Sequence, residues 1–127
     1  MTDGIEVVTR SALSLALDAT SLRQQAIATN IANASAAGFQ PLRVSFEAQL
    51  ADARLSLREG GRVDPSTLGD VRPRIETALE RQGVPAQVQL DVEAAAMARN
   101  AVHYQALAKG LSSHYAILSM AAGDGRK

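Results

Sequence analysis

Two long segments, one near each end of the chain, repeat apolar residues at alternating spacings of three and four, the spacing of a coiled-coil seam. In the first segment the seam consists of Ile5, Val8, Ala12, Leu15, Ala19, Leu22, Ala26 and Thr29. A second stripe widens this face until it suits a bundle with several neighbours better than a simple dimer: Leu13, Leu17, Ile27 and Ile31. Because no Pro interrupts the pattern, we predict one helix from about Ile5 to about Asn33, roughly 40 to 45 Å long.

The C-terminal segment carries the same pattern. Asp91 is predicted to cap the helix, and Glu93 in the first turn would favour the helix dipole. The seam that follows consists of Met97, Ala101, Tyr104, Ala108, Leu111, Tyr115, Leu118 and Ala122. Leu107, Ile117 and Ala121 broaden the face. The run Gly123, Asp124 and Gly125 is expected to end the helix.

The middle of the chain has a different composition. Ser45 is predicted to cap a short helix whose apolar face consists of Phe46, Leu50, Ala53 and Leu57. Residues 58–66 combine Gly, Pro and polar residues, which indicates a loop. Residues 75–82 fit a helix by propensity, but the flanking Pro73 and Pro85 make an extended segment equally credible. We expect much of residues 58–88 to be mobile or ordered only by a partner.

These patterns predict a mainly α fold. The long N- and C-terminal helices would form an antiparallel coiled-coil or bundle layer, with a small irregular or partly β middle region that is disordered in the monomer. The expected divisions are residues 1–35 for the N-terminal helix, 36–90 for the turn, short helix and middle region, and 91–127 for the C-terminal helix and tail. The expected helix-packing residues are Val8, Leu15, Leu22, Ile27, Met97, Tyr104, Leu111, Tyr115 and Leu118.

The same apolar stripes have a simpler explanation, because helical spacing most often marks an intramolecular core. A plain two-helix hairpin with a small subdomain would use the same pattern, so composition leaves it open beside an assembling coiled coil. The formal net charge is +0, whereas a nucleic-acid binder usually carries a basic patch. A net charge near zero also gives little electrostatic repulsion between copies of the chain. There is no Cys, no apolar run long enough for a membrane span, and no Sec-type signal pattern at Met1–Val8.

No constellation of residues predicts catalysis, a metal site or a cofactor. His103 and His114 share a helix face but lie about 16 Å apart along it, which is too far for one metal ion. No carboxylates pair in apolar surroundings, and no Ser lies in a G-x-S-x-G turn. The chain is therefore expected to be neither an enzyme nor a small-molecule binder.

The stretch from Asn30 to Phe39 closes the N-terminal helix with two asparagines, a run of small residues and Gly-Phe. Asparagine near a helix end usually bonds local backbone and terminates the turn. Gly38 is predicted to adopt a positive φ, and Phe39 would anchor the turn in apolar surroundings. The stretch is therefore predicted to redirect the chain from the helix to the middle region.

This stretch resembles the N-terminal signature of the axial proteins of the bacterial flagellum, commonly written A-x-N-I-A-N-x-x-T-P-G-F or -Y. The matching residues are Ala28, Asn30, Ile31, Ala32, Asn33, Gly38 and Phe39, while Ala36 and Ala37 stand where the family usually has Thr and Pro. The C-terminal half adds a likeness to proximal rod proteins in Leu90, Asp91, Glu93, Asn100 and the run Tyr104–Leu107. The Gly-Asn that often precedes this helix is missing. The short chain favours the proximal rod members over the longer distal-rod and hook members.

The resemblance implies a structural subunit that polymerises through its terminal helices. Such proteins are exported by the flagellar type III apparatus without a cleaved signal and lie in the periplasmic rod of the basal body. The implied partners are further copies of the chain, FlgC-like rod subunits, a FliE-type adaptor and the export gate. A cytoplasmic helical adaptor or export chaperone is the alternative from another class.

Overall fold

The computed structural model of the chain describes residues 2–62, 65–78 and 86–124. The order of elements along the described residues is α1 (Thr2–Ala32), β1 (Leu42–Ser45), α2 (Glu47–Gly60), α3 (Pro65–Gly69), β2 (Arg74–Thr77) and α4 (Leu90–Asp124). The two terminal helices dominate, with 31 residues in α1 and 35 in α4. The prediction of a mainly helical chain with long helices at both ends is therefore confirmed.

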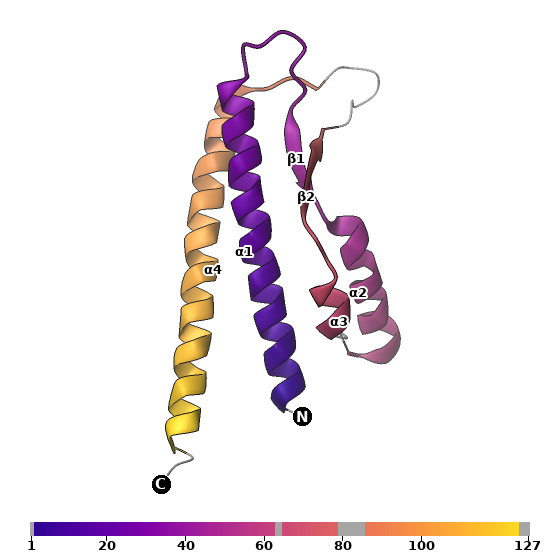
Figure 1. Cartoon of the computed structure of the whole chain (residues 1–127), viewed down its shortest axis with the longest axis vertical. Helices are drawn as coiled ribbons and strands as arrows, with labels where there is room; N and C mark the ends of the chain where they lie inside the picture. The colour runs from indigo at the N-terminus through magenta and orange to yellow at the C-terminus, as the bar shows by residue number, and fades with distance from the viewer. Residues whose placement is uncertain (1, 63–64, 79–85, 125–127) are drawn as a thin grey trace.

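Helix α1 is the middle layer of the molecule. It packs along α4 on one side and against β1 and α3 on the other (Figure 1). The two long helices run in opposite directions, and both chain ends lie at the same end of the molecule (Figure 1). Because α1 has neighbours on two sides, it contributes most of the buried residues, whereas α4 is covered along one side only.

A two-stranded antiparallel sheet connects the turn after α1 to the small helices. Strand β1 pairs with β2 in a register that places Arg43 opposite Glu76 and Val44 opposite Ile75. The Arg43 guanidinium donates to the Glu76 carboxylate at 2.8 Å, and both side chains are about half exposed. An exposed cross-strand pair of this kind stabilises by only about 0.2–1 kcal/mol, so the register depends more on Val44, which is buried.

The core is small and rich in alanine. Its apolar members come from α1, β1 and the segment after α3: Ala19, Ala26, Ile27, Val44 and Val71. Three polar residues are equally well buried, namely Thr20, Asn30 and Asn100. Alanine on α1 lets the neighbouring elements approach closely, and the buried polar side chains then need hydrogen-bond partners nearby.

The ends of the long helices differ in detail from the predictions. Helix α1 ends at Ala32, one residue before the predicted end. Asp91 does not cap α4, because the helix begins at Leu90 and the Glu93 amide already donates to the Gln89 carbonyl at 2.9 Å. Asp91 and Glu93 both lie in the first turn, where their carboxylates still favour the helix dipole. Gly123 does not stop the helix, which continues through Asp124, and Gly125 lies outside the described residues.

The middle region needs larger corrections. Ser45 is the last residue of β1, where it pairs with Arg74, so the predicted cap of α2 is wrong; Phe46 takes that position without a side-chain cap. The predicted loop over 58–66 is wrong at both ends, because α2 continues to Gly60 and α3 begins at Pro65. Pro fits the first turn of a helix, since its missing N–H is not needed there.

Of the two alternatives for residues 75–82, the extended one is correct for 75–77, which lie in β2, and residues 79–82 lie outside the described part of the chain. The described parts of 58–88 contain the end of α2, all of α3 and β2. The expectation that this range is mobile stays a prediction.

The tight packing around α1 can be tested at Ala26, which is buried, and Ala28, which is exposed on the same helix. Ala26→Leu should lower the free energy of unfolding by about 1–3 kcal/mol, because the larger side chain has no room at a position that is only 1% exposed. Ala28→Leu is the matched control and should change it by about 0.5 kcal/mol or less. Urea unfolding followed by circular dichroism measures both. Equal effects at the two positions would contradict the packing described.

Candidate interaction site: the motif turn and the helix pair

Asn30 connects the end of α1 to the start of β1. Its side-chain amide donates to the Leu42 carbonyl at 3.0 Å, and its Oδ1 accepts from the Leu42 N–H at 2.7 Å. The side chain is 1% exposed. A carboxamide carries one donor side and one acceptor side, so it pairs with both backbone groups of one residue as a neighbouring strand would. We call this pair of bonds the Asn30 clamp.

Asn33 acts only locally, as expected for an asparagine at a helix end. Its amide donates to the Thr29 carbonyl at 2.8 Å, one helical turn earlier. The turn then continues through the Ala36 amide, which donates to the Asn33 carbonyl at 2.9 Å, and the Phe39 amide, which donates to the Ala36 carbonyl at 3.3 Å. These backbone bonds close the turn although Ala36 and Ala37 stand where the signature has Thr and Pro.

Gly38 has a φ of 74°, so the predicted positive φ is confirmed. Phe39 is half-buried beside it, Ile31 is half-buried, and Ala32 is exposed. Gly38 and Phe39 line a cavity of about 430 Å³ together with residues 86–88, which lead into α4. The turn therefore lies next to the segment where the chain returns to the helix pair.

Asn100 is the only residue of α4 that is buried, at 6% exposure. Its amide donates to the Thr20 carbonyl of α1 at 2.8 Å and to Oε1 of Gln24 at 2.9 Å. Thr20 is itself buried, and its hydroxyl donates to the Leu17 carbonyl at 2.9 Å. We call Asn100, Thr20 and Gln24 the polar triad.

The predicted seam of α4 is wrong by one residue at about half of its positions. The less exposed positions in this helix are Glu93, Ala96, Met97, Asn100, Leu107, Leu111, His114 and Leu118. Asn100, Leu107 and His114 therefore take the places expected for Ala101, Ala108 and Tyr115, which are exposed. The reason is the polar triad, because its bonds to α1 fix the side of α4 that faces inward.

The other expected packing residues are distributed as follows. Ile27 is buried, and Val8, Leu15, Leu22, Met97, Leu111 and Leu118 are half-buried. Tyr104 and Tyr115 are 45% and 47% exposed. Contact of these residues with other chains stays a prediction.

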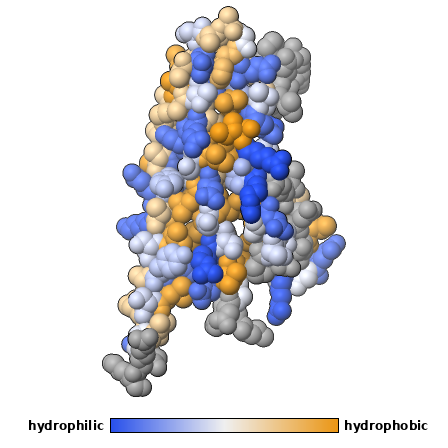
Figure 2. Space-filling view, in the orientation of Figure 1, coloured by the Kyte–Doolittle hydropathy of each residue, from blue (hydrophilic) through white to orange (hydrophobic). Residues whose placement is uncertain are grey.

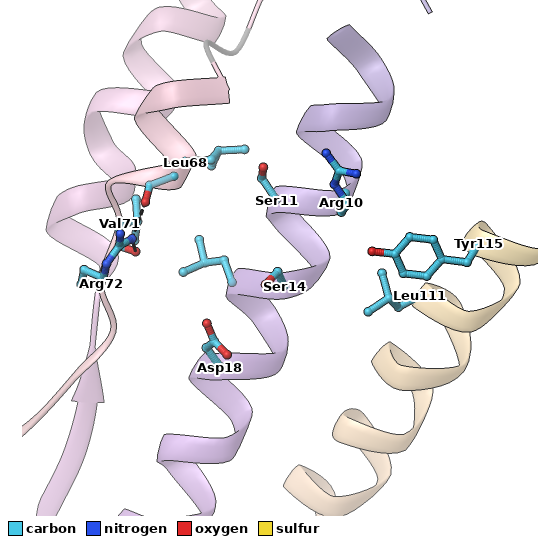
Figure 3. Close-up of a pocket in the computed structure, with 11 residues that line it drawn as sticks. Arg10, Ser11, Ser14, Asp18, Leu68, Val71, Arg72, Leu111 and Tyr115 are labelled. Atoms are coloured by element: carbon cyan, nitrogen blue, oxygen red, sulfur yellow. Dashed lines mark hydrogen bonds between the residues drawn. The ribbon is translucent and has the colours of Figure 1, made fainter. Parts of the chain in front are cut away.

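A groove of about 360 Å³ lies around α1 toward the end of the molecule that carries both termini. Leu111 and Tyr115 of α4 point toward α1 on one side of it, and Leu68, Val71 and Arg72 lie on the other (Figure 3). Arg72 donates to the Val71 carbonyl at 3.1 Å and to the Gly69 carbonyl, so backbone oxygens already hold this guanidinium. Ser11, Ser14 and Asp18 also line the groove, and no histidine is among its lining residues.

The two histidines of α4 are not brought together with other metal-binding side chains. His103 is exposed, whereas His114 is half-buried with its ring centroid 6.3 Å from that of Tyr115. Over the described residues, no group of three or more His, Cys, Asp or Glu is placed to hold a metal ion. In the same part of the chain, no helix combines the length and hydropathy that a membrane crossing requires.

Comparison with known proteins finds no family model that matches the chain and no curated protein similar to it. Any functional argument therefore depends on the residues and the geometry above.

The Asn30 clamp predicts unequal roles for the two asparagines of the motif. Asn30→Asp should lower the free energy of unfolding by about 1–3 kcal/mol, because a carboxylate cannot donate to the Leu42 carbonyl and would face it directly. Asn33→Asp is the matched control and should cost less, since its amide makes a single local bond. Urea unfolding with unchanged m-values measures the difference. A larger loss at Asn33 would contradict the clamp.

Substitution of Gly38 should affect stability only through the backbone conformation. A Cβ at this position would meet nothing within 4 Å, so the cost of a side chain comes from the positive φ alone. Gly38→Val should destabilise by about 1–2 kcal/mol, and Gly38→Asn by less, because asparagine visits the left-handed region more readily. Gly110, also with open space around it but inside α4, is the control: Gly110→Ala should stabilise by about 0.5–1 kcal/mol. Thermal unfolding measures all three, and equal stability of the Val and Asn variants would contradict the argument.

Proposed function

We propose that this chain is a structural subunit of the bacterial flagellar basal-body rod, of the proximal rod type represented by FlgB. In this proposal it is exported by the flagellar type III apparatus without a cleaved Sec signal and polymerises in the periplasm through its terminal helices. FlgC, the other short proximal rod protein, is the nearest alternative within the family.

The observation that carries the proposal is the uncovered side of α4. Residues at alternating spacings of three and four form an exposed stripe opposite the face that meets α1: Val92, Ala95, Arg99, Val102, Ala106, Lys109, Ser113, Ala116 and Met120. We call this stripe the outer face of α4. Val102 and Met120 are 66% and 63% exposed, and Figure 2 shows apolar patches along the helix pair with hydrophilic residues between them. A long, largely apolar helical face of this kind usually marks an interaction site.

The motif turn supports the same proposal. It joins a long helix to a small subdomain at one end of the molecule, and it leaves the length of the helix pair clear of that subdomain on the α4 side (Figure 1). In the proposed rod, the helix pairs of many chains would form a tubular inner layer and their subdomains would form an outer layer. The spacing of the outer face would permit coiled-coil packing against neighbouring chains, at roughly 25 cal/mol for each Å² of apolar surface buried.

The proposed partners follow from the resemblance and from the chemistry of this face. They are further copies of the chain, FlgC-like rod subunits, a FliE-type adaptor and the flagellar export gate, all of them proteins. No nucleic acid or small-molecule substrate belongs to the proposal, and neither does a cofactor or a catalytic activity. Arg99 and Lys109 on the outer face favour partner helices that place carboxylates opposite them.

A cytoplasmic helical adaptor or export chaperone is the second candidate, because an exposed apolar helical face would also suit binding of an unfolded substrate. The location of the intact chain separates the two. In flagellated cells that express the labelled chain, a rod subunit should co-purify with isolated basal bodies and be visible at the base of the rod. Recovery of the chain only in the cytoplasm would support the adaptor or chaperone and contradict the rod subunit.

The outer face of α4 can be tested separately from folding. Val102→Asp with Met120→Asp should abolish recovery in basal bodies and swimming, because two carboxylates would be buried against a neighbour. The same change should leave the isolated chain within about 0.5 kcal/mol of wild-type stability, since both sites are exposed.

The matched control lies on α2, where Leu55 and Leu57 are similarly exposed at 53% and 51%. Leu55→Asp with Leu57→Asp should leave recovery in basal bodies unchanged if α4 is the assembling helix. Normal swimming of the α4 variant would refute the proposed role of the outer face.

A further inference from the structure

The polar triad stands in the middle of a helix contact to which α4 contributes mostly apolar residues, with Glu93 and His114 as the half-buried polar exceptions. Half-buried apolar residues of α4 lie on either side of Asn100 in the sequence, with Met97 before it and Leu107 and Leu111 after it. The amide of Asn100 uses both of its donors, one on the Thr20 carbonyl and one on Gln24. Its Oδ1 is buried and has no hydrogen-bond partner among the described residues.

This arrangement is a poor choice for stability alone. A buried polar group that is only partly paired loses its hydration without full replacement, whereas a leucine would lose nothing polar. Leucine already packs at other positions of the same contact, for example Leu107 and Leu111. The residue therefore needs an explanation other than a gain in stability, and a buried asparagine in a helix seam is known to specify register and partner at a cost in stability.

The sequence of α1 shows what Asn100 discriminates against. A shift of α4 by one heptad in one direction would move its amide from Thr20 and Gln24 to Leu13 and Leu17. A shift in the other direction would move it to Ile27 and Ile31. The bond to Thr20 goes to its backbone carbonyl, so the contact that a shift removes is the side-chain oxygen of Gln24, which Leu17 or Ile31 would replace. Leu107 would move at the same time from Leu13 and Leu17 to Glu6 and Arg10 in the first shift, or to Thr20 and Gln24 in the second.

We propose that Asn100 is a specificity-determining residue, which makes α4 pair with its own α1 in one antiparallel register. Without it, registers shifted by one heptad and pairing with helices of other copies would be less strongly disfavoured. The role does not depend on the rod assignment, because it follows from the contacts within one chain. If the chain does assemble, the polar triad keeps the inner face of α4 closed and reserves the outer face for partners.

Disulfide reporters can measure the register directly, since the chain contains no Cys of its own. Because the helices are antiparallel and Asn100 meets Thr20 and Gln24, Leu107 should lie one heptad further along, beside Leu13 and Leu17. The pair Leu17→Cys with Leu107→Cys reports the native register. The pair Arg10→Cys with Leu107→Cys reports α4 shifted by one heptad.

In the wild-type background only the native pair should form a disulfide in good yield. Asn100→Leu should raise the yield of the shifted pair by about tenfold, the factor that 1.4 kcal/mol corresponds to, and should add disulfides between chains at high concentration. The thermal midpoint of Asn100→Leu should not fall. Asn33→Leu is the matched control and should leave the shifted yield at the wild-type level, because the Asn33 side chain donates to the Thr29 carbonyl of α1 and not to α4.

The variant Asn100→Leu with Gln24→Leu replaces both polar side chains and provides a second test if the single variant does not fold. It too should show the shifted disulfide. A shifted yield that stays at the wild-type level in a folded variant would overturn the proposal and leave Asn100 as a residue of stability only. Failure of both variants to fold would also overturn it, because the residue would then be needed for the fold itself and not for the choice of register.

Discussion

The pair of hydrogen bonds between Asn30 and the backbone of Leu42 is the constraint on which the rest of the structure depends. It turns the last turn of α1 into a fixed starting point for β1, twelve residues later. Once β1 lies along α1, Val44 is buried against the helix, and β2 is held by its pairing with β1. The Gly38 turn supplies the conformation that lets the chain reverse over so few residues. One side chain of the long helix thus fixes where the small subdomain begins, and the packing of β1 and α3 against α1 holds the rest of it.

Helix α1 owes its central place to polar contacts on two sides. Asn30 pairs with the subdomain, and the Thr20 carbonyl and Gln24 pair with Asn100 of α4. The apolar core beside these contacts is small, and two of its five residues are alanine. Directional hydrogen bonds specify geometry better than a small apolar core does, because each polar group is satisfied in one arrangement only. The molecule therefore defines where its helices lie while leaving much apolar surface on α4 for partners, which is the property that the proposed rod subunit needs.

The periodicity of the sequence predicts the two long helices well, because a spacing of three and four over some thirty residues has few other structural solutions. The positive φ of Gly38 is also predictable, since a glycine in a tight turn commonly adopts it. The hydrogen-bond partner of Asn30 is not predictable from the sequence. An asparagine at a helix end is expected to bond nearby backbone, as Asn33 does. The predicted caps at Ser45 and Asp91 fail for a related reason: pairing with Arg74 and the early start of α4 override local capping preference.

The seam of α4 shows where periodicity reaches its limit. Two stripes on α4 have the same spacing and differ by one residue. One passes through Ala101, Ala108 and Tyr115 and the other through Asn100, Leu107 and His114. Hydropathy favours the first stripe as the buried one. The structure uses the second, since Asn100 finds hydrogen-bond partners that no pattern within one segment reveals. The register of two helices is thus decided by a contact between residues eighty positions apart.

Hydrogen exchange at the Leu42 amide tests the Asn30 clamp most directly. The N–H donates to a buried side-chain oxygen and not to a strand, so its protection depends on Asn30 alone. Measured by NMR on the isolated chain, it should exchange as slowly as the amide of buried Ile27 in α1. Exchange as fast as that of exposed Gln40, two residues earlier, would contradict the account.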